Sequence, residues 1–228
     1  MTAVGPIAGG SVGGASSRVT YLEPVVAPEG EAPQDIGTGH EMRRVTEQVA
    51  ADPAAWTPEL AAHVDRFFEE RSGTWHTAVS PRSEVALADL LDRIREGFPG
   101  PVVELGAGTG SGTAALAARF EHVVAGDLSA GMLERLPASL ASRVRLDASV
   151  LPFADHVVGT LVCVNMLLFA DEVRRVLRDD GVLVWVNSIG ECTPIHLPAH
   201  LVAEALGDGF EVTASRAGWG TWAVARRT

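Results

Sequence analysis

The residues best suited to chemistry lie in the glycine-rich stretch 102–112, Val-Val-Glu-Leu-Gly-Ala-Gly-Thr-Gly-Ser-Gly. An apolar run ends there in Glu104 and Leu105, glycines follow at alternate positions, and an alanine-rich helical pattern covers 113–119. This order predicts a buried strand, a tight turn and a helix. Glycine suits such a turn because it adopts backbone angles closed to other residues and lets a ligand approach the main chain. The helix N-terminus would direct free N–H groups at that ligand.

Two further acidic residues each end a short run after the glycine turn, and the first of these runs is apolar. Asp127 follows the run 122–126, and Asp147 follows the run 143–146. In an open α/β sheet, a carboxylate at the first of these positions binds both hydroxyls of a ribose. Each aspartate could instead be a helix cap or a turn residue, so their order after the glycine turn is what favours ligand binding.

The glycine turn, Asp127, Asp147 and the segment 151–155 (Leu-Pro-Phe-Ala-Asp) occur in an order typical of one family. From about residue 81 to the C-terminus, the chain resembles the class I S-adenosylmethionine (SAM) dependent methyltransferases. Within them it is most similar to the small-molecule branch of the ubiquinone-biosynthesis type. The resemblance implies SAM as the cofactor.

The resemblance also implies a role for each residue on the cofactor side. Glu104 would lie near the ammonium group of SAM, Asp127 would bind the ribose hydroxyls, and Leu128 would cover a face of the adenine. Asp147 would accept a hydrogen bond from the adenine amino group, and the Ala148 N–H would bond to a ring nitrogen. The expected cofactor residues are Glu104, Gly106, Ala107, Gly108, Asp127, Leu128, Asp147, Ala148 and Asn165.

The acceptor side departs from the family pattern. Gly159 stands where an aspartate usually opens the strand, and Leu168-Phe169 replace a frequent pair of histidines. A base for an oxygen or acidic-carbon nucleophile could come from His76 or His196, since a neutral imidazole is available near pH 7. Either histidine could equally be a solvated or loop-fixing residue. Trp75, beside His76, is a candidate lid residue, because the family often builds one wall of the acceptor pocket there.

The elements that position these residues predict an α/β, doubly wound, Rossmann-like fold. Short apolar strands alternate with helical patterns, which is typical of a mostly parallel sheet with helices on both faces. Segments 210–217 and 221–226 predict a C-terminal hairpin. The expected sheet has seven strands, one made antiparallel by this hairpin, and an N-terminal helical cap precedes it.

Three segments are expected along the chain. Residues 1–40 are rich in glycine and proline, which predicts a flexible tail in which Val19 to Val26 could dock as an extended piece. Residues 41–80 predict a helical cap or lid, and residues 81–228 predict the SAM-binding core.

Composition restricts the class of protein. The chain has 228 residues with 46% hydrophobic content, enough for a full core. Its net charge of −11 disfavours non-specific binding to phosphate backbones, so no nucleic-acid partner is expected. The histidines, carboxylates and two cysteines lack metal-ligand spacing, which predicts no metal site and a reduced, cytoplasmic setting. Neither a membrane-spanning run nor a signal-peptide pattern is present, so no membrane partner is expected.

Three functions remain open from the sequence. The favoured one is a SAM-dependent methyltransferase for a small organic acceptor, whose nucleophile is oxygen, nitrogen or carbon. A homodimer is compatible with this function. The second is a SAM-binding protein that does not methylate, such as a cyclase, a regulator or a scaffold. The third is an NAD-dependent oxidoreductase, against which the terminal hairpin and the Asp147 segment argue.

Overall fold

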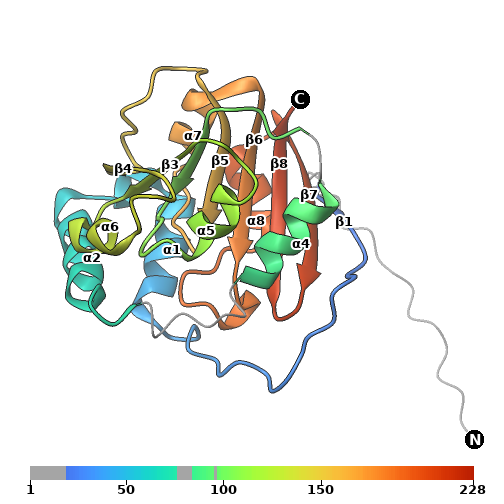
Figure 1. Ribbon diagram of the computed structural model, residues 1–228, viewed down its shortest axis with the longest axis horizontal. Coiled ribbons are helices and arrows are strands. Elements are labelled where there is room, and N and C mark those ends of the chain that lie inside the picture. The colour runs from blue at the N-terminus through green and yellow to red at the C-terminus, as the bar shows by residue number, and fades with distance from the viewer. Residues whose placement is uncertain (1–18, 76–83, 95–96) are drawn as a thin grey trace, which may run out of the picture.

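A sheet of eight strands forms the centre of the part of the chain that the computed structural model describes, residues 19–75, 84–94 and 97–228 (Figure 1). The strand order is β1-β7-β8-β6-β5-β2-β3-β4. Neighbouring strands are parallel except that β8 pairs antiparallel with both β6 and β7. The strands are β1 (Val19–Tyr21), β2 (Val102–Leu105), β3 (Val123–Asp127), β4 (Ser142–Arg145), β5 (Val158–Val164), β6 (Leu177–Asn187), β7 (Phe210–Ala217) and β8 (Gly220–Arg227).

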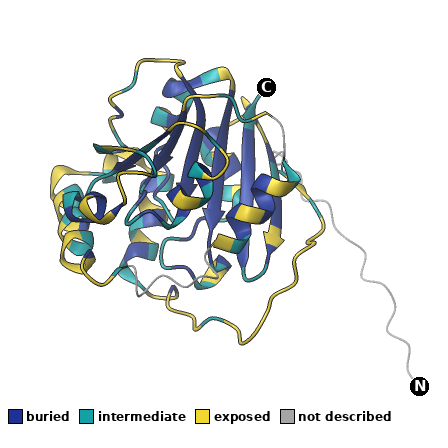
Figure 2. Cartoon of the chain, viewed as in Figure 1, coloured by how far each residue is buried: buried dark blue, intermediate teal, exposed yellow. Residues whose placement is uncertain are grey.

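The central strands are buried on both faces (Figure 2). β2 and β5 are mostly apolar, as is typical of parallel strands covered on two sides. Along β6, Leu183 and Trp185 pack into one core, whereas Val182 and Val184 pack into another. Because successive side chains of a strand point to opposite faces, the sheet separates two apolar cores.

Helices supply the other half of each core. α4 and α5 contribute Leu87 and Leu116 to one core, and α7 and α8 contribute Val173 and Val202 to the other, which α1 joins through Met42. The helices are α1 (Glu41–Ala51), α2 (Pro58–Arg71), α4 (Val85–Arg93), α5 (Ser111–Ala117), α6 (Ala130–Arg135), α7 (Ala170–Val176) and α8 (Ala199–Leu206), with 3-10 turns η1 (Pro53–Ala55) and η3 (Gly190–Cys192). None of the helices in the described ranges has the length and apolar character needed to cross a membrane.

The observed fold confirms the α/β prediction and adds one strand to it. The seven expected strands are β2 to β8, and the terminal hairpin is β7 with β8. The eighth strand, β1, comes from the segment 1–40, for which the sequence predicts a flexible tail with an extended piece at 19–26. It pairs parallel with β7, and the Leu22 N–H donates to the Ala214 carbonyl at 2.8 Å. Without β1, β7 would be an edge strand with unpaired backbone groups, which an extended segment can satisfy.

Two helices precede the core, where the sequence predicts a cap. α1 and α2 match the expected helical patterns, and α2 begins after Thr57, whose side chain accepts a hydrogen bond from the Leu60 N–H. Glu69 of α2 accepts hydrogen bonds from the Ser129 hydroxyl at 2.7 Å and the Gly131 N–H at 2.8 Å. These bonds attach α2 to the start of α6, just beyond the end of β3.

Candidate functional site

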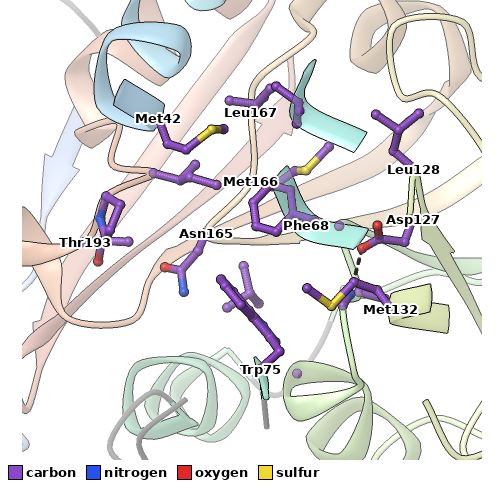
Figure 3. A pocket seen from close by; sticks show the side chains of 18 of the residues that line it. Met42, Phe68, Trp75, Asp127, Leu128, Met132, Asn165, Met166, Leu167 and Thr193 are labelled. Atoms are coloured by element: carbon purple, nitrogen blue, oxygen red, sulfur yellow. Dashed lines mark hydrogen bonds between the residues drawn. The ribbon is translucent and has the colours of Figure 1, made fainter. Parts of the chain in front are cut away.

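A cavity of about 420 Å³ lies at the carboxyl ends of the parallel strands, with α1 and α2 on its other side (Figure 3). Gly106, Asp127, Asp147, Asn165 and Ser188 line it, each at or just beyond the end of a different strand. Ligands of open α/β sheets bind at this edge, because the turns that leave the strands converge there.

All the residues that the sequence predicts for the cofactor line this one cavity: Glu104, Gly106, Ala107, Gly108, Asp127, Leu128, Asp147, Ala148 and Asn165. Figure 3 shows Asp127 and Leu128 on one side of the cavity and Met42 and Thr193 on the opposite side. The predicted cofactor residues, which are spread along the sequence, therefore come together in space. The role of each residue toward the cofactor stays a prediction.

The glycine turn connects β2 to α5 through positive φ angles. Gly106 has a φ of 71° and Gly108 a φ of 55°, in the left-handed region that favours glycine. The N–H groups of Gly106 and Ala107 donate to the Gly126 carbonyl at 2.9 and 3.1 Å. A Cβ on Gly106 would also lie 2.5 Å from the sulfur of Met166. The backbone angle favours glycine at this position, and a larger residue would also displace the Met166 side chain.

Asp127 joins the glycine turn to the loop after β3. One carboxylate oxygen accepts from the Gly108 N–H at 2.8 Å, and the other accepts from the Ser129 N–H at 2.9 Å. Burial raises the pKa of this carboxyl, and the backbone hydrogen bonds oppose the rise. The two carboxylate oxygens together have about four lone-pair positions, so these backbone bonds leave capacity for a ligand hydroxyl.

Glu104 lies beneath the turn and is 1% exposed, although it lines the cavity. It accepts a hydrogen bond from the Thr113 hydroxyl at 2.5 Å. Burial raises the pKa of Glu104 to about 8, the nearby Asp127 also raises it, and the Thr113 hydrogen bond opposes both. Glu104 is therefore largely protonated at neutral pH when no cationic group is beside it.

Asp147 has a partner that sequence reasoning missed. The Trp56 indole N–H lies 3.1 Å from each of the two Asp147 carboxylate oxygens, and the Ser149 N–H donates to one of them at 2.8 Å. Trp56 follows η1, outside the segment that carries the family resemblance. Nothing in its local sequence signals this contact, because the two residues are 91 positions apart.

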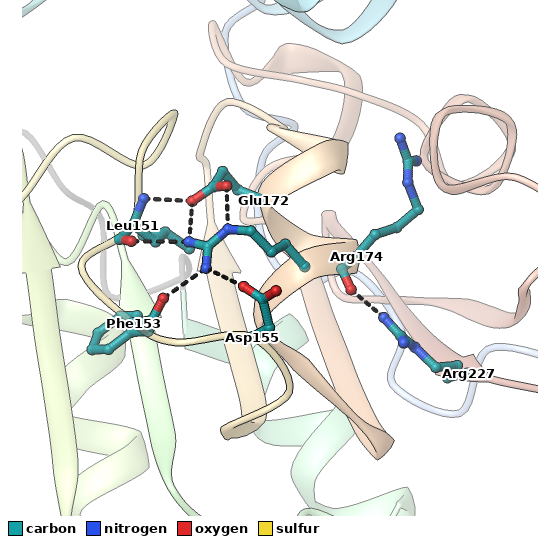
Figure 4. A network of polar contacts seen from close by, with 7 residues as sticks. Leu151, Phe153, Asp155, Glu172, Arg174 and Arg227 are labelled. Carbon is teal, nitrogen blue, oxygen red and sulfur yellow. Dashed lines mark hydrogen bonds and ion pairs between the residues drawn. The ribbon is translucent and has the colours of Figure 1, made fainter.

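An arginine holds the loop that follows Asp147 (Figure 4). Arg175 of α7 donates to the carbonyls of Leu151 at 2.9 Å and Phe153 at 2.7 Å, and it pairs with Asp155 at 2.9 Å. It also binds both oxygens of Glu172, which in turn accepts from the Leu151 N–H at 2.5 Å. The hydrogen bonds from Arg175 lower the pKa of Glu172. This network fixes the segment 151–155 that the sequence singles out.

Replacing Arg175 with methionine is expected to lower the melting temperature by about 5 °C, because the loop carbonyls and Glu172 lose a shared donor. Thermal unfolding followed by circular dichroism measures the shift. The matched control is Arg178→Met, which removes a half-exposed arginine that pairs with Asp180 at 2.9 Å and donates to the Gly100 carbonyl at 3.2 Å. It is expected to shift the melting temperature by less than about 2 °C. Equal shifts in the two variants would contradict a structural role specific to Arg175.

The part of the cavity wall outside the predicted cofactor residues is mostly apolar. Trp75 packs edge-on against Phe68 with ring centroids 5.4 Å apart, and its indole nitrogen lies 3.6 Å from where a Cβ on Gly108 would sit. Trp75 thus packs onto α2 and lies beside the glycine turn, and its role as a lid stays a prediction. Other apolar residues of this wall are Met42, Phe67, Met166, Leu167 and Ile195.

Asn165 connects the ends of two strands beside this wall. It has a φ of 50°, a conformation that asparagine tolerates better than most residues. Its side-chain amide donates to the Ser188 hydroxyl at 2.8 Å, and its carbonyl oxygen accepts from the Ser188 N–H at 2.8 Å. The amide therefore already holds the loop after β6 and keeps limited capacity for a ligand.

Of the two predicted histidine bases, His196 is the one that the structure describes, and it does not line the cavity. His196 is 7% exposed and is absent from the residues that line the cavity, although its neighbour Ile195 is present. Burial, assisted by the charge of Arg43, lowers the pKa of His196 to about 4. A buried ring that does not line the cavity is poorly placed to take a proton from a bound acceptor, so nothing in the site supports His196 as a base and that role stays a prediction. His76 lies outside the described residues.

A different histidine lines the cavity, and the sequence analysis missed it. His40 precedes α1, and its Nδ1 accepts a hydrogen bond from the Met42 N–H at 3.1 Å. Because Nδ1 is the acceptor, the neutral ring carries its hydrogen on Nε2. His40 therefore lines the cavity with its Nδ1 already occupied by the Met42 N–H. Its position just ahead of a predicted helix was the available signal.

No group of three or more histidine, cysteine or acidic residues suited to a metal ion occurs among the residues that the structure describes.

Comparison with known proteins points to one family. Residues 103–185 match the family model described as a methyltransferase domain. The chain is 30% identical over 178 residues to a malonyl-[acyl-carrier protein] O-methyltransferase from Methylovorus sp. (strain MP688), covering 68% of this chain and 58% of that protein. It is 39% identical over 95 residues to a demethylmenaquinone methyltransferase from Clavibacter sepedonicus, covering 36% of this chain and 39% of that protein. The chain thus spans less than two thirds of the length of either relative.

Solved structures share the fold at low sequence identity. The structure titled as a DhpI-SAH complex superposes with a TM-score of 0.60 at 19% identity, covering 71% of this chain and 94% of that one. A SAM-dependent methyltransferase from Aquifex aeolicus superposes with a TM-score of 0.54 at 17% identity, covering 68% and 96%. These similarities support the fold. The ligand is inferred from the residues that line the cavity.

Proposed function

The chain belongs to the class I SAM-dependent methyltransferases, and from this premise we propose that it transfers a methyl group from SAM to a small organic acceptor held in the same cavity. The observation that carries the proposal is the convergence of Glu104, Asp127 and Asp147 on one cavity around the glycine turn. These three carboxyl groups match, in order, an ammonium group, a ribose and an adenine amino group.

The cavity fits such a ligand in its donor and acceptor groups. Glu104 and Asp127 are acceptors with free lone pairs, as an ammonium group and two hydroxyls require. Leu128 provides apolar surface, and Ala148 provides a backbone N–H beside Asp147. When bound, SAM supplies an electrophilic methyl group on a sulfonium centre.

The residues of the chain then act chiefly by positioning. Holding two reactants in line can lower a barrier by about 7 to 11 kcal/mol. The apolar wall formed by Phe68, Trp75 and Met166 excludes water, and the carboxyl groups at the strand ends hold the cofactor side of the cavity. His40 offers a hydrogen-bond donor to the acceptor, and its Nδ1 is already occupied.

The same observations support the further parts of the proposal. A mostly apolar wall suits a small organic acceptor, whose nucleophile is oxygen, nitrogen or carbon. The net charge of −11 supports the absence of a nucleic-acid substrate. We further propose that the protein is cytoplasmic and that it can form a homodimer. The proposed segments are a tail over residues 1–40, a helical cap over 41–80 and a SAM-binding core over 81–228.

We expect SAM and S-adenosylhomocysteine to bind with micromolar dissociation constants, and we expect no comparable binding of NAD. A ligand at 100 times its dissociation constant adds about 2.7 kcal/mol to the free energy of unfolding, so both adenosyl ligands should raise the melting temperature by several degrees. Isothermal titration calorimetry measures the affinities directly. Binding of NAD without binding of either adenosyl ligand would contradict the proposal. Methyl transfer itself is tested by following S-adenosylhomocysteine release with a panel of small acceptors.

A further inference from the structure

The segment ahead of the matched domain places a tryptophan on the carboxyl group that the family resemblance assigns to adenine. Trp56 lies between η1 and α2, and its indole N–H is equidistant from both oxygens of Asp147. Its ring packs edge-on against Phe169, with centroids 5.3 Å apart and planes at 72°. Trp56, Asp147 and Phe169 all line the cavity. The cap therefore contacts the cofactor side of the site as well as the acceptor side.

The hydrogen bonds to Asp147 limit how a ligand can approach it. A carboxylate has about four lone-pair positions on two oxygens. The Ser149 N–H uses one position on Oδ1, and the Trp56 N–H lies between Oδ1 and Oδ2. The plane of the carboxylate is thus held from two sides, and Oδ2 is the oxygen with most room for another donor. Such a preorganised acceptor favours a ligand that brings an N–H and disfavours one that brings a carbonyl oxygen.

We propose that Trp56 is a positioning residue that determines base specificity, because it orients the Asp147 carboxylate to accept from a 6-amino purine and to reject a 6-oxo purine. This inference rests on the proposed function, since it presupposes an adenosyl ligand. Trp56 lies ahead of residues 103–185, so neither the family match nor the resemblance assigns it a role.

The test compares the dissociation constants of S-adenosylhomocysteine and S-inosylhomocysteine, which differ at the purine 6-position. Wild-type protein is expected to prefer the 6-amino ligand by about a hundredfold. Trp56→Phe keeps an aromatic ring but removes the indole N–H, and its preference is expected to fall about tenfold. The matched control is Trp219→Phe, which removes an indole N–H that donates to the Glu29 carbonyl at 3.1 Å, away from this cavity. The control is expected to keep the wild-type preference.

A second pair of variants shows whether Trp56 acts through Asp147. In an Asp147→Ala background the preference for the 6-amino ligand should be small, and Trp56→Phe should not reduce it further. An unchanged preference in Trp56→Phe would overturn the inference. So would an equal loss from Trp56→Phe with and without Asp147. If wild-type protein binds neither ligand, the proposed function itself fails, which is a distinguishable result.

A further measurement covers the case in which Trp56→Phe does not fold. The indole N–H signals of ¹⁵N-labelled wild-type protein are assigned from variants of the other tryptophans. The Trp56 signal is expected to shift when S-adenosylhomocysteine binds and to move again in Asp147→Ala. A Trp56 signal that responds to neither change would overturn the inference.

Discussion

Asp127→Ala is expected to weaken the binding of SAM by about tenfold to a hundredfold, because a hydrogen-bonded carboxylate contact is worth about 1.5 to 3 kcal/mol. The substitution removes the proposed acceptor for the ribose hydroxyls. It also releases the Gly108 and Ser129 N–H groups, which the carboxylate binds at 2.8 and 2.9 Å. The glycine turn then loses part of its preorganisation, which places the expected loss toward the upper end of the range.

Calorimetry with S-adenosylhomocysteine measures this loss, and circular dichroism confirms that the variant is folded. Asp180→Ala is the matched control, since it removes an exposed carboxylate paired with Arg178. The control should bind with wild-type affinity. A folded Asp127→Ala protein with unchanged affinity would remove Asp127 from the cofactor site.

The affinity for SAM is expected to fall about tenfold for each pH unit below pH 8, and to level off above it. In the unliganded protein, burial raises the pKa of Glu104 to about 8, so this carboxyl binds a proton at pH 7. An ammonium group beside it favours the carboxylate, so ligand binding releases that proton. Lower pH opposes the release and weakens binding, by about a hundredfold between pH 8 and pH 6.

Titration calorimetry at pH 6.5 in two buffers of different ionisation enthalpy measures the number of protons released, which should be close to one. Glu104→Gln is expected to bind SAM more weakly at pH 8 and to lose the pH dependence between pH 6 and 8. The buried neighbour Thr113 can donate to either side chain, so the variant retains that hydrogen bond. Proton release that persists undiminished in Glu104→Gln would show that another group titrates.

The same ionisation predicts a stability change in the unliganded protein. Below about pH 4.5, Glu104 is protonated in both the folded and unfolded states. As the pH rises from there to about 8, the unfolded chain loses this proton first, because its pKa is the lower of the two. The contribution of Glu104 to the free energy of unfolding therefore decreases over that range.

The amino-acid sequence by itself determined the fold class and predicted the set of residues that line one side of the cavity. The runs before Glu104, Asp127 and Asp147 are short, the first two are apolar, and each ends in an acidic residue or a glycine turn. In a parallel sheet the carboxyl ends of the strands meet at one edge, so residues that end strands converge without further information. The positive φ angles at Gly106 and Gly108 are likewise local requirements that the residue type reveals.

Only the tertiary structure decided which side chains from outside the strands reach that edge. Trp56 contacts Asp147 across 91 positions, and His40, not His196, lies on the cavity wall. The pairing of β1 with β7 joins the N-terminal segment to the end of the chain in the same way. Strands, turns and helices follow from local backbone preferences and from the spacing of apolar residues along the chain. The contacts of Trp56, His40 and β1 depend instead on how the N-terminal helices and the loops pack against the completed sheet. That packing is a property of the whole chain, and no short segment of the sequence encodes it.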